Sequence, residues 1–152
     1  KYLRGDAKVL TKDEQAGLKL YIDKGCADCH SGINLTSDGY YPFGVVERPA
    51  ANILAGDKGR FAMTEASDDE FAFKAPTLRN IEYTAPYFHS GKVWTLNEAV
   101  ALMSSAQLGI KLSSKETGLI VSFLKTLTGE QPQVAYPILP PSTDKTPRPQ
   151  WD

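Results

Sequence analysis

The two cysteines of the chain lie three positions apart and are followed at once by a histidine, in the run Cys26-Ala27-Asp28-Cys29-His30. This C-x-x-C-H pattern is the signature of c-type haem attachment. Two thiols about one helical turn apart reach the two vinyl groups of one porphyrin, and the imidazole that follows them binds the iron as its proximal ligand. The spacing therefore predicts one covalently bound haem c, with Cys26, Cys29 and His30 as its binding residues.

Other uses of a cysteine pair fit the sequence less well. A thioredoxin-like dithiol would need a β-α-β setting, whereas the surrounding pattern is helix, long loop, helix and helix. A zinc site would need four ligands at finger-like spacing, but His30 directly follows Cys29 and the other histidine, His89, is isolated. A disulfide between the two cysteines would leave His30 without a role.

The sixth coordination position of the iron has three candidates, which are Met103, Met63 and His89. A thioether ligand would raise the reduction potential, a second imidazole would lower it, and an open position would permit peroxide or oxygen chemistry. Met103 lies on the apolar face of a predicted helix, where packing in the core is the usual role of methionine. Met63 lies in a charged stretch that is expected to be exposed. With a haem in the domain we favour Met103, and the other two remain alternatives.

Three segments have the apolar spacing of amphipathic helices, at residues 11–24, from 95 to 104 or beyond, and at 113–128. Each opens with Ser or Thr followed three residues later by Glu, which is a capping box that satisfies free amide groups at the start of a helix. The pairs are Thr11 with Glu14, Thr95 with Glu98, and Ser113 with Glu116. Glycines end the first and the third helix, at Gly25 and Gly129.

The stretch between the first two helices, residues 31–94, has no comparable period and is rich in glycine, proline, aspartate and aromatic residues. Irregular segments of this length are uncommon unless they wrap something, and a haem would give the aromatic side chains a surface to pack on. Residues 131–152 carry six of the ten prolines, which favours an extended tail. We therefore predict an all-α, cytochrome c-type haem domain over residues 1–130, with long irregular loops and an extended Pro-rich C-terminal tail.

The tail is either a disordered terminus or an arm that lies on a neighbouring domain. A purely solvated linker would lack large apolar side chains. The tail has four of them, which are Tyr136, Ile138, Leu139 and Trp151. The sequence favours neither interpretation over the other.

Composition limits the partners of the chain. Its 152 residues fit one domain, and 17 Lys and Arg against 18 Asp and Glu give a net charge of −1. This balance lacks the basic surface typical of proteins that bind nucleic acid or anionic membranes. No apolar run approaches the ~18 residues that a membrane-spanning helix needs. Because the sequence begins at Lys1 without an initiator methionine, we expect a mature or excised piece of a longer protein.

Several longer segments resemble one family. The segments are 73–81 (FKAPTLRNI), 84–91 (TAPYFHSG), Gly59-Arg60-Phe61, and Gln107-Leu108-Gly109 shortly after Met103. Together they resemble the C-terminal half of the bacterial dihaem cytochrome c peroxidases. A second C-x-x-C-H would be expected upstream in that family. The relative MauG replaces the methionine at the position of Met103 by tyrosine, so Met103 favours the peroxidase branch.

The resemblance implies a set of site residues. His30 and Met103 would be the two iron ligands of the electron-accepting, high-potential haem. A calcium ion would lie between the two haem domains, bound by the backbone carbonyls of Thr84 and Pro86 and by an Asn of the other domain; hard oxygen ligands suit this ion. Arg79 is a candidate partner for a haem propionate, because a guanidinium matches a carboxylate bidentately.

Three further residues have weaker cases. Lys74 is as easily a solvated surface charge as a propionate partner. His89 is favoured as a hydrogen-bonded structural histidine over a residue at the haem edge. Trp94 is favoured as a packing residue over a part of an electron route, since aromatic side chains mostly bury apolar area.

The same resemblance implies the function. The chain would be the electron-transferring domain of a periplasmic peroxidase, accepting electrons from a small cytochrome c or a cupredoxin. An N-terminal peroxidatic haem domain would reduce hydrogen peroxide to water, so the isolated chain is expected to be inactive as a peroxidase. A homodimer is compatible with the family. The alternatives are a self-contained monohaem electron carrier and, with weaker support, a sensor in which a labile Met103 opens the iron.

Overall fold

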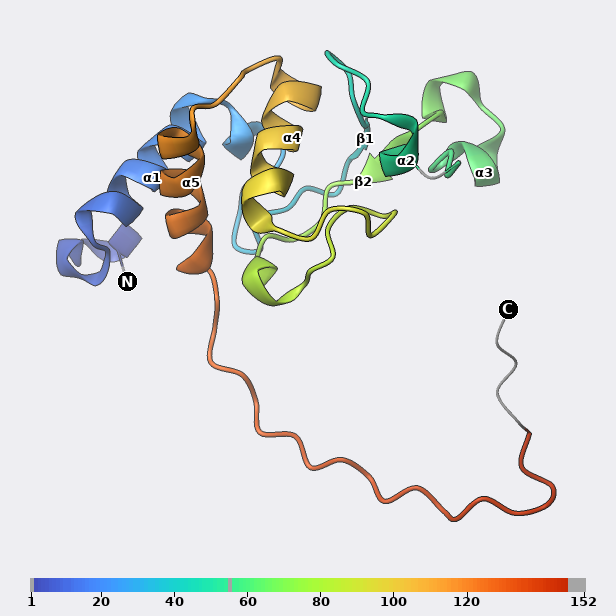
Figure 1. The fold of residues 1–152 in the computed structure, drawn as a ribbon. Coiled ribbons are helices and arrows are strands. Elements are labelled where there is room, and N and C mark those ends of the chain that lie inside the picture. The colour runs from blue at the N-terminus through green and yellow to red at the C-terminus, as the bar shows by residue number, and fades with distance from the viewer. Residues whose placement is uncertain (1, 55, 148–152) are drawn as a thin grey trace.

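The computed structural model describes residues 2–54 and 56–147 of the chain. The regular elements are α1 (Lys12–Asp23), β1 (Tyr40–Pro42), α2 (Ala51–Leu54), α3 (Phe61–Thr64), β2 (Ala72–Lys74), α4 (Leu96–Leu108) and α5 (Ser114–Lys125). Short 3-10 turns are η1 (Tyr2–Arg4), η2 (Ala7–Val9), η3 (Cys26–Asp28), η4 (Ser67–Asp69) and η5 (Ile81–Tyr83). Figure 1 shows α1, α4 and α5 at one end of the domain and β1, β2, α2 and α3 at the other.

The three longest helices start where the sequence predicts. Thr11, Thr95 and Ser113 are their N-caps, and each makes both hydrogen bonds of a capping box with the Glu three residues later. The helix α4 extends beyond 104 to Leu108 and ends at Gly109, which has the left-handed conformation that glycine adopts without strain (φ 66°).

The main core lies where α1 crosses α5. The two helices approach closely at Gly17, where an added Cβ would lie 1.9 Å from the carbonyl oxygen of Leu119. One turn along α1, the Tyr21 ring packs on Phe123 with ring centroids 5.1 Å apart. Ile120 is 1% exposed, and α4 packs on α5 from the other side (Figure 1). We call α1, α4 and α5 the helical frame; the cysteine-containing turn directly follows α1, and its Cys26 and Ala27 pack against this core.

The segment 31–94 is less regular than the helices but does contain a sheet. The strands β1 and β2 pair antiparallel, with Tyr41 opposite Phe73. A second buried cluster of Tyr87, Val93 and Ala99 joins this segment to α4. The described chain is thus helix-rich with one small sheet. The predicted all-α class did not include this sheet, because strands of three residues are too short to show the alternation of apolar and polar residues that predicts a strand.

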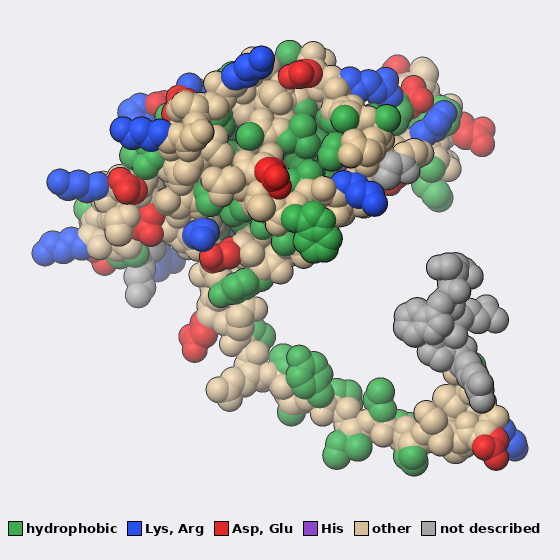
Figure 2. Space-filling model, viewed as in Figure 1, with side chains coloured by type: hydrophobic (Ala, Val, Ile, Leu, Met, Phe, Trp, Pro, Cys, Tyr) green, Lys and Arg blue, Asp and Glu red, His purple; other side chains and the backbone are tan. Residues whose placement is uncertain are grey.

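After α5 the chain has no regular secondary structure from residue 128 to the end of the described range, apart from a turn near Thr143 (Figure 1). Its apolar side chains are exposed, with Tyr136 at 89% and Ile138 at 98%, and they are visible as separate green groups along the tail in Figure 2. Trp151 lies outside the described residues. No helix in the described part of the chain has both the length and the apolar character needed to cross a membrane.

Candidate haem site

The turn η3 carries Cys26 at its start and is followed directly by Cys29. Gly25 ends α1 in the left-handed region (φ 88°), and Cys26 to Asp28 then form a single 3-10 turn in which the Cys29 amide donates to the Cys26 carbonyl. Both cysteines are free thiols and half-buried. Two thiols held one turn apart at the edge of the helical frame fit the two thioether bonds of a c-type haem.

His30 is oriented by the backbone around it. Its Nδ1 lies 3.2 Å from the carbonyl oxygen of Pro76, and since a carbonyl can only accept, Nδ1 carries the proton. The Tyr21 hydroxyl donates to the carbonyl of His30 itself. Iron-binding histidines characteristically donate the second ring N–H to such an acceptor, which leaves Nε2 free for the metal. Burial lowers the pKa of His30, which favours the neutral, metal-binding imidazole.

The cysteine pair lacks the electrostatic setting of a redox-active dithiol. Burial raises the pKa of Cys26, and burial followed by the nearby Asp28 carboxylate raises that of Cys29. Thioredoxin-like cysteines instead have lowered pKa values, because their chemistry requires the thiolate. In addition, no group of three or more His, Cys, Asp or Glu side chains suited to a metal ion occurs within the described ranges. The residues of this turn therefore fit a haem better than a dithiol catalyst or a zinc site.

The two methionines differ sharply in their surroundings. Met63, on α3, is 88% exposed, whereas Met103, on α4, is half-buried. Met103 is not among the side chains that pack against either buried cluster of the described chain. A core role for Met103 thus finds little support, and of the two thioethers it is the less exposed one.

His89 and Trp94 differ from what their sequence context favours. The ring of His89 stacks on Phe73 at 3.9 Å between centroids and meets Phe43 edge-on at 6.2 Å. No hydrogen bond of its ring is found among the described residues, so aromatic stacking takes the place of the expected hydrogen bond. Trp94 is 69% exposed and does not fill the core. Packing was expected because aromatic residues usually bury their area, but this one lies at the surface just before α4.

Arg79 and Lys74, the two candidate propionate partners, donate to backbone carbonyls. Arg79 donates from Nε and Nη2 to the carbonyl oxygen of Ile33, at 3.0 and 2.7 Å. Lys74 donates to the carbonyl of Ser37 at 3.1 Å. Both contacts fix the stretch that follows His30 against the stretch that contains Pro76, so these residues shape the surroundings of the imidazole.

Thr84 and Pro86, the expected carbonyl ligands of calcium, follow η5 and are exposed. They lie at the surface of the domain, which leaves them accessible to a second domain. The Thr84 hydroxyl donates to the Ile81 carbonyl at 3.2 Å.

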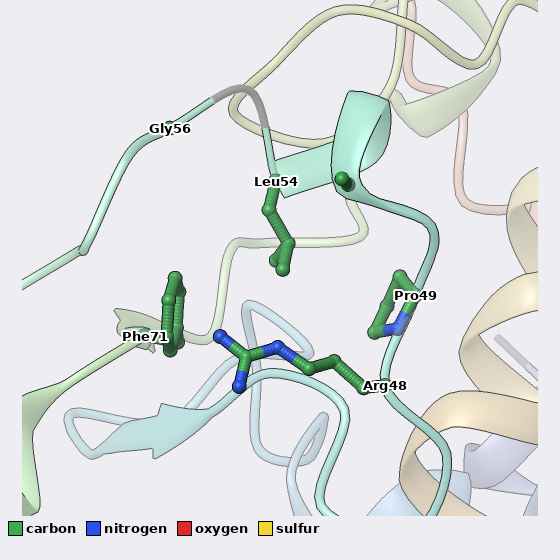
Figure 3. A pocket seen from close by; sticks show the side chains of 6 residues that line it. Arg48, Pro49, Leu54, Gly56 and Phe71 are labelled. Carbon is green, nitrogen blue, oxygen red and sulfur yellow. The ribbon is translucent and has the colours of Figure 1, made fainter.

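An open depression lies away from these residues, at the end of the domain that contains the sheet. It is lined by Arg48, Pro49, Ala51, Leu54, Gly56 and Phe71 (Figure 3). Within it the guanidinium of Arg48 lies over the Phe71 ring, 4.1 Å from the centroid. The depression contains none of the residues predicted to bind haem, and its one charged lining group is already engaged with an aromatic ring.

Sequence reasoning missed two residues of the site. Pro76 accepts from His30, and Tyr21 donates to its carbonyl. In the sequence Tyr21 belongs to the apolar face of a helix, and this pattern does not indicate that its hydroxyl forms a hydrogen bond. The role of Pro76 depends on a contact across 46 positions of the sequence, which no local pattern reports.

Comparison with known proteins identifies the family. No protein-family model matches the chain. The cytochrome c551 peroxidase of Pseudomonas aeruginosa is 54% identical over 149 residues, covering 97% of this chain and 43% of that protein. The cytochrome c551 peroxidase of Nitrosomonas europaea is 44% identical over 155 residues, covering 99% of this chain and 44% of that protein.

A solved structure agrees with these relatives. The crystal structure of a MauG-like protein associated with microbial copper homeostasis matches with a TM-score of 0.68 and 31% identity, over 85% of this chain and 47% of that one. The chain thus spans less than half the length of each of these three proteins. Given these relatives, the chain belongs to the family of dihaem cytochrome c peroxidases and MauG-like proteins.

Proposed function

We propose that this chain is the electron-transferring haem domain of a dihaem cytochrome c peroxidase, and that its haem is bound by Cys26, Cys29, His30 and Met103. The observation that carries the proposal is the bond from His30 Nδ1 to the Pro76 carbonyl, beside two thiols on one turn. The identity of 54% to a cytochrome c551 peroxidase supports the reaction class.

Each part of the chain has a defined task in this function. A bound c-type haem supplies reversible one-electron chemistry. Cys26 and Cys29 fix the group to the end of α1, and Pro76 holds the ring of His30 with Nε2 free. Met103 contributes a thioether, a soft ligand that favours reduced iron and raises the potential. The domain therefore accepts electrons and passes them on, and it does not itself open a position for peroxide.

The partners follow from the same proposal. A small cytochrome c or a cupredoxin supplies electrons, and an N-terminal peroxidatic domain reduces hydrogen peroxide to water in the periplasm. The backbone carbonyls of the exposed residues Thr84 and Pro86 complete a calcium site with that domain. The apolar side chains of the tail, with Ile138 at 98% exposure, supply an arm that packs on it. A homodimer is compatible with this arrangement.

The ligand assignment is tested on the oxidised holoprotein. Methionine-ligated ferric haem has a weak charge-transfer band at long wavelength. We expect Met103→Ala to abolish this band and Met63→Ala to leave it intact, because Met63 is 88% exposed and Met103 is half-buried. The reverse pattern would refute the assignment.

The division of labour is tested by peroxide turnover. The isolated chain loaded with haem should reduce and reoxidise, yet show negligible peroxidase activity. Rapid turnover of hydrogen peroxide by the isolated chain would contradict the proposal. If the isolated chain instead exchanges electrons rapidly with both a small donor and a small acceptor protein, the self-contained electron carrier would be supported.

A further inference from the structure

The last turn of α4 carries a glutamine whose side chain holds a distant loop. The carboxamide oxygen of Gln107 accepts from the amides of Gly44 at 2.6 Å and of Val45 at 3.4 Å. Its Nε2 donates to the carbonyl of Pro42 at 3.1 Å. One side chain thus uses both its donor and its acceptor on the backbone of the loop that follows β1.

The backbone at the end of α4 binds the same loop. The carbonyl of Ala106, one of the last in the helix, accepts from the amides of Val46 at 3.0 Å and Glu47 at 3.2 Å. Gly109 lies so close to this loop that an added Cβ would be 2.8 Å from Cγ1 of Val46. Residues 42–47, which we call the clamp loop, are therefore fixed to the C-terminal end of α4 by both side-chain and main-chain contacts.

The clamp loop lies between the elements that carry the two proposed iron ligands, and within the described part of the chain no hydrogen bond or strand pair joins it to either ligand. Met103 lies four residues before Gln107, so the two side chains share one face of α4. At the other end, Pro42 is the last residue of β1 and pairs with Ala72 of β2. The chain then runs from β2 to Pro76, the acceptor for His30 Nδ1. A continuous path of hydrogen bonds and backbone thus joins the helix of Met103 to the carbonyl that orients His30.

We propose that Gln107 is a positioning residue for the haem ligands: by clamping residues 42–47 it fixes α4, and with it Met103, relative to the strands that lead to Pro76. The inference rests on the proposed function, because it assumes that Met103 binds the iron. Without the clamp, α4 remains a helix, since its capping box and its contact with α5 are untouched. Only the position of Met103 relative to His30 loosens.

Three variants of the haem-loaded chain separate this role from general packing. Gln107→Ala removes all the side-chain bonds to the clamp loop, while Gln107→Glu keeps the acceptor for Gly44 and loses the donor to Pro42. Gln15→Ala is the matched control, because Gln15 also bonds two backbone carbonyls, those of Ala7 and Leu10, but does so at the start of α1.

The readout is the Met–iron charge-transfer band followed with temperature, beside helix content from far-ultraviolet circular dichroism. We expect Gln107→Ala to lose the band at a lower temperature than the wild type and well before its helices unfold. Gln107→Glu should give an intermediate shift and Gln15→Ala none. The Gly44 and Val45 amides should exchange about tenfold faster in Gln107→Ala, as for the loss of one hydrogen bond.

Two results would overturn the inference. If the band of Gln107→Ala disappears at the wild-type temperature, or only together with the helices, the glutamine is merely structural. The proposed ligand is tested separately by Met103→Ala. A band that survives that substitution would refute Met103 as ligand, and this inference with it, whatever the behaviour of Gln107.

Discussion

The helical frame of α1, α4 and α5 and the irregular segment 31–94 are stabilised in different ways. Each helix of the frame starts at a capping box between residues three apart, and their packing buries apolar side chains such as Ile120. The segment is held by polar side chains on distant backbone, as where Thr77 donates to the Asn34 carbonyl at 2.6 Å. The helices of the frame therefore start from local sequence signals and pack through apolar side chains, whereas the segment relies more on polar side chains that bind distant backbone, besides its small buried cluster of Tyr87 and Val93 with Ala99.

The residues of the candidate haem site are divided between the frame and the segment. The cysteines follow directly on α1, so their turn is placed by the frame. The acceptor of His30, the aromatic stack of His89 and the carbonyl ligands proposed for calcium all belong to the segment. Changes to the frame should therefore affect global stability, and changes to the segment should open the surroundings of the haem locally.

The largest effect is expected at the crossing of α1 and α5. In Gly17→Ala the new Cβ would meet the Leu119 carbonyl oxygen at 1.9 Å, so the helices must move apart. We expect a loss of about 3 kcal/mol in the free energy of unfolding, at the upper end of the cost of overpacking. Chemical denaturation of the haem-loaded protein measures it.

The matched control is Gly118→Ala on α5. It makes the same change in a helix, but no atom lies within 4 Å of the added Cβ. Alanine should stabilise the helix by roughly 0.5–1 kcal/mol. Equal effects of the two substitutions would show that helix propensity, and not the close crossing, determines the stability of the frame.

A smaller, local effect is expected in the segment. Arg79→Ala removes two hydrogen bonds to the Ile33 carbonyl and should cost about 1–2 kcal/mol. The amide of Leu78, bonded to the Leu35 carbonyl at 3.2 Å, should exchange faster with solvent, while amides of α5 keep their protection. Arg79→Lys should recover only part of the loss, because an ammonium lacks the guanidinium fork. Uniform loss of protection throughout the chain would contradict the separation of frame and segment.

The smallest effect concerns pH and the start of α5. The Glu116 carboxylate accepts from the Ser113 amide at 2.9 Å and from its hydroxyl at 2.8 Å, and Lys24 lies 3.1 Å away. These bonds, that of the Ser113 amide foremost, lower the pKa of Glu116 from 4.5 to about 2. Because the pKa is lowered in the folded state, the stabilisation is complete above pH 4.5 and is lost as the pH falls through about 2.

Ser113→Ala tests this link. It removes the hydroxyl but keeps the backbone amide, so the pKa of Glu116 should rise partway towards 4.5. A carboxyl titration by NMR measures the value directly. An unchanged titration of Glu116 in Ser113→Ala would show that the hydroxyl contributes nothing to holding the carboxylate ionised.

The helical frame was more predictable from the sequence than the segment 31–94. The starts of the three capped helices and the C-x-x-C-H turn were predictable, because each depends on residues within one or two turns. The end of the third helix was wrong: α5 ends at Lys125, before the predicted stop at Gly129. The sheet escaped because its strands are three residues long. The stacking of His89 and the exposure of Trp94 also escaped, because both depend on what the folded segment places around them. The identity of the sixth ligand stays a prediction, with Met103 favoured because it is half-buried whereas Met63 is exposed.

The central claim is that this chain binds one haem covalently through Cys26 and Cys29. The most direct test is a pyridine haemochrome spectrum of the protein after unfolding and extraction with acidified organic solvent. We predict that the haem stays with the polypeptide and shows the c-type spectrum, and that Cys26→Ala with Cys29→Ala releases it. Haem that is extracted from the wild-type chain, or a chain that binds none, would contradict the account.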